Sequence, residues 1–313
     1  MPTRQSGDGS LSVTSCVALG AALLLALGTV LSPLLFSFDP DEETSAVSCT
    51  TYGLAADDPR AEPTQIIDAS FRAGTTYSAA GELGEMAQTF THNGLTGQYH
   101  VIDGGVNTNK PVGLVMHLHG DGAREYHDPS GRTTCLASVA ASHNALLVVP
   151  RTPDKTQDPT WWEDLKGNRD WLTSLVNDRI LQDYPVDRNR ITWMGYSGGA
   201  EMLSYGILAG PRDLVTGGAA LVGGGGAPQS LNTDPTESQL ETMPLWWITG
   251  KEDDGSTTSA PFDAVSAAVS GAAFYQDQGF ERVDLKLLAS YNHFNMPDAR
   301  ILDDLMKTAE QDR

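Results

Sequence analysis

Short apolar segments alternate with helical patterns after residue 84, and this alternation limits the possible fold more than any other feature. The segments have the length and composition of buried strands, and they cover residues 112–118, 145–150, 190–195, 217–224, 244–250 and 283–290. Helices are predicted between or after them, over about 131–142, 170–184, the residues after Ser197, 263–279 and 298–311. Strands that alternate with helices predict an α/β fold with a mainly parallel sheet and helices on both faces.

Two earlier segments predict an antiparallel addition to this sheet. Residues 86–92 and 97–103 alternate apolar and polar side chains, and Asn93-Gly94 lies between them. Asn-Gly is a favoured pair for a two-residue hairpin turn. We therefore expect an antiparallel N-terminal hairpin within one α/β domain that covers residues 84–313.

One serine lies at a corner between a predicted strand and a predicted helix. Residues 195–199 read Gly-Tyr-Ser-Gly-Gly, at the end of the strand segment 190–195. The pattern G-x-S-x-G is a weak signal by itself, and a plain turn is the alternative explanation. At a strand-to-helix corner, however, it is typical of the sharp turn that presents a nucleophilic serine. The position therefore predicts Ser197 as a nucleophile.

A nucleophilic serine needs a base, and chain order selects the histidine. Of seven histidines, His293 alone follows the serine, and it comes just after the last predicted strand. A carboxylate that orients this histidine is expected after a strand between the two, where residues 248–254 read ITGKEDD. We predict Asp253 as the acid, with Asp254 next and Asp234 third. The alternative is that these are solvated loop carboxylates.

An acyl-transfer intermediate also needs backbone N–H donors for its oxyanion. One is expected at Gly198, directly after the serine. The second is expected in the loop after strand segment 112–118, where the chain reads His-Gly-Asp-Gly. We assign it to Asp121, with Gly122 as the reserve, because the glycines allow the backbone to bend. A glycine-rich turn without a role is the alternative.

A tryptophan-rich stretch precedes the helix predicted over 170–184. Residues 160–171 read TWWEDLKGNRDW, near the edge of the sheet that carries the other loops. Exposed aromatic rings there are suited to stack on a sugar or an aromatic acyl group. We predict Trp161 and Trp162 as substrate contacts and Trp171 as a core residue. Core packing of all three is the alternative.

The N-terminus predicts attachment to a membrane. Residues 17–36 are almost continuously apolar, and Arg4 precedes them while an acidic stretch follows. This pattern predicts a short cytoplasmic tail over 1–16 and a transmembrane anchor or signal segment over 17–37. Residues 38–83, rich in Asp, Ala, Thr and Pro, are then predicted as a flexible linker. The catalytic domain is expected outside the cytoplasm, and secretion after cleavage is the alternative.

Charge and cysteine content exclude two classes of protein. The net charge is −20, from 40 acidic and 20 basic residues, so a nucleic-acid partner is not expected. The cysteines show no zinc-type spacing. If the domain is exported, Cys49 and Cys135 are the available internal pair, and we predict a disulfide between them. Two unpaired thiols are the alternative.

Several of these stretches together resemble the α/β-hydrolases, and in particular the polyhydroxybutyrate depolymerase and feruloyl or acetyl-xylan esterase group. The resemblance covers about 85–311, and its most specific part is the helix, Tyr-Pro-Val-Asp, arginine and strand that lead to the serine. The stretches that carry it are 116–122, 170–202, 248–254 and 292–294. It implies an ester-cleaving serine hydrolase in which Ser197, Asp253 and His293 are catalytic.

The chain departs from that group in two places. Members often carry a cysteine after the His-Gly of the oxyanion strand, where this chain has Asp121. Their histidine often lies in a glycine-rich, tryptophan-containing stretch, whereas here residues 291–297 read YNHFNMP. These differences bear on the substrate class more than on the mechanism.

The predicted function is therefore an extracytoplasmic serine esterase that acts through an acyl-enzyme on a small-molecule or polymeric ester. No metal or organic cofactor is expected, and the sequence predicts no oligomeric state. One alternative is a metallohydrolase that uses His117 and His119, because residues 117–121 match most of an H-x-H-x-D-H motif. The others are an acyltransferase with the same three residues and a non-catalytic surface protein on a hydrolase scaffold.

Overall fold

The computed structural model describes residues 47–63, 76–77, 84–257 and 259–311. The predicted tail 1–16 and membrane segment 17–37 lie outside the described residues. In the described part of the chain, no helix combines the length and the apolar character needed to cross a bilayer. The described residues belong to one compact unit, and the following description concerns that unit.

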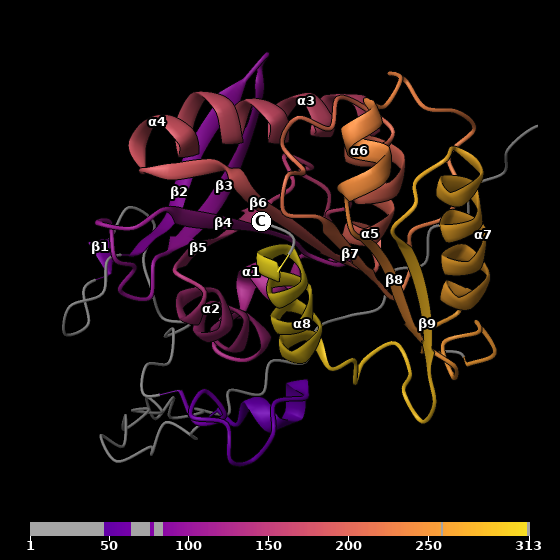
Figure 1. The fold of residues 1–313 in the computed structure, drawn as a ribbon, viewed down its shortest axis with the longest axis horizontal. Helices are drawn as coiled ribbons and strands as arrows, with labels where there is room; N and C mark the ends of the chain where they lie inside the picture. Colours follow the sequence, from indigo (N-terminus) through magenta and orange to yellow (C-terminus); the bar gives the residue numbers. More distant parts are fainter. Residues whose placement is uncertain (1–46, 64–75, 78–83, 258, 312–313) are drawn as a thin grey trace, which may run out of the picture. The chain divides into compact units, whose positions relative to one another are not determined.

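The described strands form one nine-stranded sheet in the order β1-β2-β3-β5-β4-β6-β7-β8-β9 (Figure 1). Neighbours from β5 to β9 run parallel, whereas β1, β2 and β3 pair antiparallel and β3 also pairs antiparallel with β5. The strands are β1 (Thr76–Tyr77), β2 (Gly84–His92), β3 (Leu95–Ile102), β4 (Val112–Leu118), β5 (Ala145–Arg151), β6 (Val186–Tyr196), β7 (Ala219–Val222), β8 (Leu245–Gly250) and β9 (Val283–Leu288). The predicted α/β sheet and its antiparallel hairpin are therefore confirmed.

The hairpin forms where the sequence predicts it. Asn93 and Gly94 both have positive φ, +50° and +81°, as a two-residue turn of this type requires. The strands β2 and β3 then pair from His92 and Leu95 outward. This places β3 against β5 and completes one side of the sheet.

The helices cover both faces of the sheet (Figure 1). They are α1 (Arg124–His127), α2 (Arg132–Ser142), α3 (Leu165–Ser174), α4 (Leu181–Asp183), α5 (Gly198–Met202), α6 (Glu237–Thr242), α7 (Ala264–Asp277) and α8 (Asp298–Gln311). A 3-10 turn η1 (Cys49–Tyr52) and two π-helical stretches, η2 (Leu175–Ile180) and η3 (Leu203–Leu208), complete the set. The helix predicted over 170–184 begins earlier, because the Asp164 side chain caps it by accepting the Gly167 N–H.

Alternate residues of each central strand supply two separate apolar cores. In β4, Leu114 and Met116 join the core beneath α3, η2, η3 and α7. Val115 joins the other core, beneath α2 and α8. Because both faces of the sheet are covered, β4 is buried along its whole length, as its mostly apolar composition predicts.

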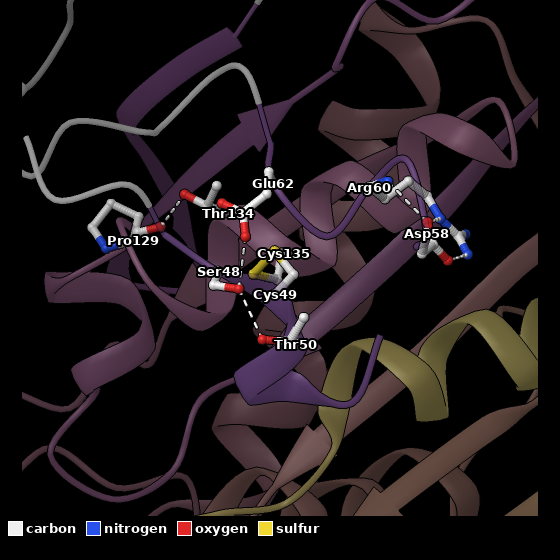
Figure 2. Close-up of a disulfide and its surroundings, with 9 residues drawn as sticks. All are labelled: Ser48, Cys49, Thr50, Asp58, Arg60, Glu62, Pro129, Thr134 and Cys135. Carbon is white, nitrogen blue, oxygen red and sulfur yellow. Dashed lines mark hydrogen bonds and ion pairs between the residues drawn. A yellow bond between two sulfur atoms is a disulfide. The ribbon is translucent and has the colours of Figure 1, made fainter. Parts of the chain in front are cut away.

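The segment 47–63, here called the N-terminal strap, packs on the α2 and α8 face. A disulfide joins Cys49 to Cys135 of α2, as predicted (Figure 2). The Cys49 N–H donates to the Ala61 carbonyl at 2.7 Å, which closes the strap on itself. Arg60 forms an ion pair of 2.6 Å with Asp303 of α8.

The strap corrects one prediction about organisation. Residues 47–63 lie inside the predicted flexible linker 38–83, yet Cys49, Leu54 and Ala61 are buried. The order of this segment is not predictable from its polar composition. The disulfide and the ion pair hold the strap in place, and few apolar side chains contribute. The described part of the linker is therefore folded onto the domain.

Candidate active site

The serine corner has the strained backbone that its sequence predicts. Ser197 lies between the end of β6 and the start of α5, with φ +52° and ψ −119°. A Cβ on Gly195 would lie 2.3 Å from the Gly199 carbonyl oxygen, and one on Gly199 would lie 2.3 Å from the Leu118 oxygen. Only glycine fits at either position, so the two glycines permit a turn that lifts the serine out of the sheet.

Ser197, His293 and Asp253 form one chain of hydrogen bonds. His293 lies in the histidine loop, residues 289–297 after β9, and its Nε2 is 2.9 Å from the Ser197 Oγ. Its Nδ1 is 2.8 Å from Asp253 Oδ2. Because a carboxylate only accepts, Nδ1 carries the proton, which leaves Nε2 free to accept the serine hydroxyl proton. The arrangement can therefore activate a serine oxygen.

The structure distinguishes among the candidate carboxylates. Asp253 follows β8, is 1% exposed and contacts His293. Asp254 instead is exposed and accepts the Ser256 N–H at 3.0 Å. Asp234 is also exposed and lies near Arg212. Of these three carboxylates, only Asp253 reaches the histidine.

The loop after β4 brings a second amide to the serine. In this β4 loop, residues 119–122, His119 Nδ1 lies 2.6 Å from the Gly120 carbonyl oxygen, and His119 Nε2 accepts the Thr152 N–H at 3.1 Å. The Nδ1–H therefore donates to Gly120. A trans peptide points its carbonyl and its N–H in opposite directions, so the Asp121 N–H faces away from His119.

That amide lies beside the first turn of α5. The Asp121 nitrogen is 3.4 Å from the point where a Gly198 Cβ would be. In the described residues, neither the Gly198 N–H nor the Asp121 N–H donates to another protein group. The reserve candidate, Gly122, donates its N–H to the Pro159 carbonyl at 3.1 Å and is therefore occupied.

No protein-family model matches the chain, and no curated protein sequence matches it. Solved structures are nevertheless similar. An acylaminoacyl peptidase from Pyrococcus horikoshii is 13% identical with a TM-score of 0.53, and the match covers 72% of this chain and 41% of the peptidase. An arylesterase is 11% identical with a TM-score of 0.50, over 77% of this chain and 89% of the arylesterase. The chain has an α/β-hydrolase fold.

The α/β-hydrolase fold explains why residues far apart in the sequence meet. The chain passes from β4 to β5 on one side, whereas β6 lies on the other side of β4. Loops after β4 and β6 therefore open at a switch point of the sheet, where ligands bind in such folds. The serine, the acid and the histidine follow β6, β8 and β9, in the chain order typical of this fold.

The two histidines of the alternative metal motif, His117 and His119, are not arranged to bind a metal ion in this hydrolase fold. Both ring nitrogens of His119 contact backbone groups, so neither faces an ion. His117 is fully buried, and burial lowers its pKa to about 4. In the described ranges, no three His, Cys, Asp or Glu side chains are placed to hold a metal ion.

A cleft of about 470 Å³ opens over the serine. Ser197 and His293 line it, and Phe262 and Phe294 add aromatic walls that are 42% and 59% exposed. Tyr52, from the N-terminal strap, lines it as well. No sequence motif identifies these aromatic side chains as part of the site, although Phe294 is adjacent to the predicted histidine.

The two predicted tryptophan contacts have different environments. Trp161 is fully buried, and its Nε1–H donates to the His119 carbonyl at 3.0 Å, so its prediction as a substrate contact is wrong. Trp162 is 52% exposed, and its Nε1–H donates to Asp121 Oδ2 at 3.2 Å. Burial raises the pKa of the Asp121 carboxyl, and this hydrogen bond opposes the shift. A substrate contact at Trp162 stays a prediction.

Proposed function

We propose that this chain is a serine hydrolase that cleaves carboxylic esters. The observation that carries the proposal is the hydrogen-bonded series Ser197–His293–Asp253, which lies in an open cleft. Two amides that have no acceptor among the described residues, at Gly198 and Asp121, lie beside the serine. This set contains a nucleophile, a base, an orienting acid and an oxyanion site.

The reaction follows from the positions of these groups. Ser197 Oγ attacks the ester carbonyl while His293 Nε2 takes the hydroxyl proton, and Asp253 stabilises the imidazolium. The Gly198 and Asp121 N–H groups donate to the tetrahedral oxyanion. The imidazolium then protonates the departing alcohol, which leaves an acyl-enzyme on the serine. Water, deprotonated by His293, attacks this acyl-enzyme and releases the acid.

We propose an ester substrate because aromatic side chains line the cleft beside the serine, and because one of the similar structures is named an arylesterase. We also propose that residues 17–37 anchor the chain and that the domain acts outside the cytoplasm, with secretion as the alternative. The disulfide supports this location, because such bonds persist in oxidising compartments.

The test is hydrolysis of short p-nitrophenyl esters by the full chain and by Ser197→Ala. We expect the variant to lose about 10⁴-fold or more of kcat, and a fluorophosphonate probe to label only the wild type at Ser197. A chelator should leave the activity unchanged. Activity that survives in the variant would contradict the proposal, and faster cleavage of the matching p-nitroanilides would contradict its ester part.

A further inference from the structure

A largely buried arginine beside the cleft contacts three elements that adjoin the loops of the candidate active site. Arg132, the first residue of α2, is 11% exposed. Its Nη1 lies 2.9 Å from Glu125 Oε1, and its Nε lies 2.8 Å from Asp298 Oδ2. Its guanidinium carbon also lies 4.0 Å above the centre of the Tyr196 ring. The carboxylates belong to α1 and α8, and the ring belongs to the last residue of β6.

One of these contacts leads to the β4 loop. Glu125 is buried, and its second oxygen, Oε2, accepts the Gly120 N–H at 3.1 Å. Gly120 directly precedes Asp121, whose N–H is the proposed oxyanion donor. The Arg132–Glu125 pair therefore helps to fix Gly120, the residue before the Asp121 N–H that must face the serine.

The other two contacts lead to the histidine loop. Asp298 is the first residue of α8 and directly follows that loop. The Tyr196 hydroxyl donates to the backbone carbonyl of His293 at 2.6 Å, and the two rings lie 5.2 Å apart. Arg132 therefore reaches this loop from both sides, through Asp298 and through the Tyr196 ring.

We propose that Arg132 is a positioning residue that holds the β4 loop and the histidine loop in one register through Glu125 and Asp298. This inference rests on the proposed function, because the register matters only if both loops act on one substrate. Catalysis is sensitive to such register, since a misplacement of about 1 Å costs roughly 100-fold in rate. The loops come from opposite halves of the chain, and among the described strands β4 and β9 do not pair with each other.

A purely stabilising role does not explain this cluster. Two carboxylates face one guanidinium, so the fully ionised group carries a net negative charge in a buried position. The Asp298 carboxylate is fully buried, and apart from its ion pair with Arg132 it makes no hydrogen bond to another described residue. Buried ion clusters of this kind are often less stabilising than apolar side chains of the same volume. Their presence is better explained by what they orient.

Direct binding of an anionic substrate does not explain it either. Arg132 lines the cleft, but its Nη1 and Nε face carboxylates and its plane covers a tyrosine ring. Arg132 holds the pKa of Glu125 below its usual value, although burial opposes this shift. The positive charge is therefore already neutralised within the cluster, and little of it is directed at a ligand.

A double-mutant cycle on kcat tests the proposal in the full chain with a p-nitrophenyl ester. We expect Glu125→Gln and Asp298→Asn each to lower kcat about tenfold, with KM changed less than about twofold. If one arginine couples the two loops, the double variant should lose far less than the product of the single effects. In an Arg132→Met background, neither substitution should lower kcat further.

Arg212→Met is the matched control. Arg212 is 2% exposed and donates to the carbonyls of Leu208, Gly210 and Thr233, away from the cleft. Its loss should lower the melting temperature and leave kcat unchanged. If Arg132→Met does not fold, the cycle between Glu125→Gln and Asp298→Asn still decides the question.

Two results would overturn the inference. Multiplicative effects of the two single variants would mean that the loops are independent, and unchanged kcat values would mean that the cluster positions nothing. Both require a wild type that hydrolyses the ester and reacts with the fluorophosphonate at Ser197. A wild type that does neither would instead contradict the proposed function.

Discussion

The edge of the sheet and the N-terminal strap both supply walls of the same cleft, but they reach it by different physical means. At the sheet edge, Ser197, Asp253 and His293 follow β6, β8 and β9, and strand pairing fixes where each loop begins. The strap, residues 47–63, has one helical turn, and a disulfide and an ion pair hold it. Periodic segments are positioned by hydrogen-bonded pairing, whereas this segment is positioned by a few specific links.

The largest expected effect lies at the sheet edge. Asp253→Asn should lower kcat about 10⁴-fold, because the amide no longer holds the His293 tautomer that accepts the serine proton. The change leaves the serine in place, so fluorophosphonate labelling should become slow while folding, measured by circular dichroism, stays unchanged.

Asp254→Asn is the matched control for that variant. Asp254 is adjacent in sequence but exposed, and it accepts the Ser256 N–H. Its kcat should equal that of the wild type. If this variant lost as much activity as Asp253→Asn, the assignment of the acid would be wrong.

The next largest effect concerns the strap. Replacing Cys49 and Cys135 together with serine should lower the free energy of unfolding by about 4 to 5 kcal/mol, because the bridge closes a separation of 86 residues. Urea denaturation measures this loss. Since Tyr52 then loses its tie to α2, KM should also rise while Ser197 stays reactive with the probe. Unchanged stability and KM would mean that the strap is held without the disulfide.

Asp298 lies between the histidine loop and the strap, and its buried negative charge is expected to lower the stability of the fold. Burial raises its pKa to about 6, and Arg132 only partly offsets this. The folded state therefore binds the proton more tightly than the unfolded state, in which the carboxyl has its ordinary pKa of 3.8. Below pH 4 the carboxyl is protonated in both states, and the free energy of unfolding is not reduced by it. As the pH rises through about 6, the fold loses stability because the unfolded carboxyl ionises more readily.

Asp298→Asn should therefore be more stable than the wild type at pH 7, by up to about 3 kcal/mol, and similar to it below pH 4. Thermal unfolding of both proteins between pH 3.5 and 7 measures this difference. Higher stability together with lower kcat would separate positioning from support of the fold. A variant that is less stable at every pH would show that the carboxylate supports the fold itself.

The smallest expected effect is that of a single hydroxyl on the strap. Tyr52 lines the cleft, and its hydroxyl makes no hydrogen bond to the described residues. Tyr52→Phe should raise KM a few-fold for esters with a polar group, in line with the loss of about 1 kcal/mol, and leave kcat unchanged. Tyr184→Phe, at the end of α4, is the control with unchanged KM. An unaltered KM for Tyr52→Phe across a series of esters would remove the strap from substrate binding.

The sequence predicts much of the sheet edge because each step there follows from a period or from chain order. Apolar runs place the strands, glycines place the serine corner, and His293 is selected because it alone follows Ser197. The choice of Asp253 over Asp254 was closer, since both follow β8. Which of the two carboxylates faces His293 depends on the conformation of the loop after β8, and the sequence does not determine that conformation.

Other parts of the site were not predictable for physical reasons. Trp161 and Trp162 are neighbours with the same side chain, yet one is buried under the β4 loop and the other is exposed. No periodicity exists in a loop to distinguish them. The short helices α1 and α6 are likewise too short to show a helical repeat, although α1 supplies the carboxylate that holds Gly120.

The contact between the strap and α8 also affects the order in which the domain can mature. Arg60 pairs with Asp303, and a Cβ on Gly53 would touch Pro297, so the strap rests on residues that leave the ribosome more than 200 positions later. During synthesis, the disulfide can therefore form only after Cys135 has been made, 86 residues after Cys49, and the contact of the strap with α8 can form only after the last helix has been made. The strap, although made early, can therefore pack only after the last helix has been made. The wall of the cleft that Tyr52 forms is complete only in a chain that extends through α8.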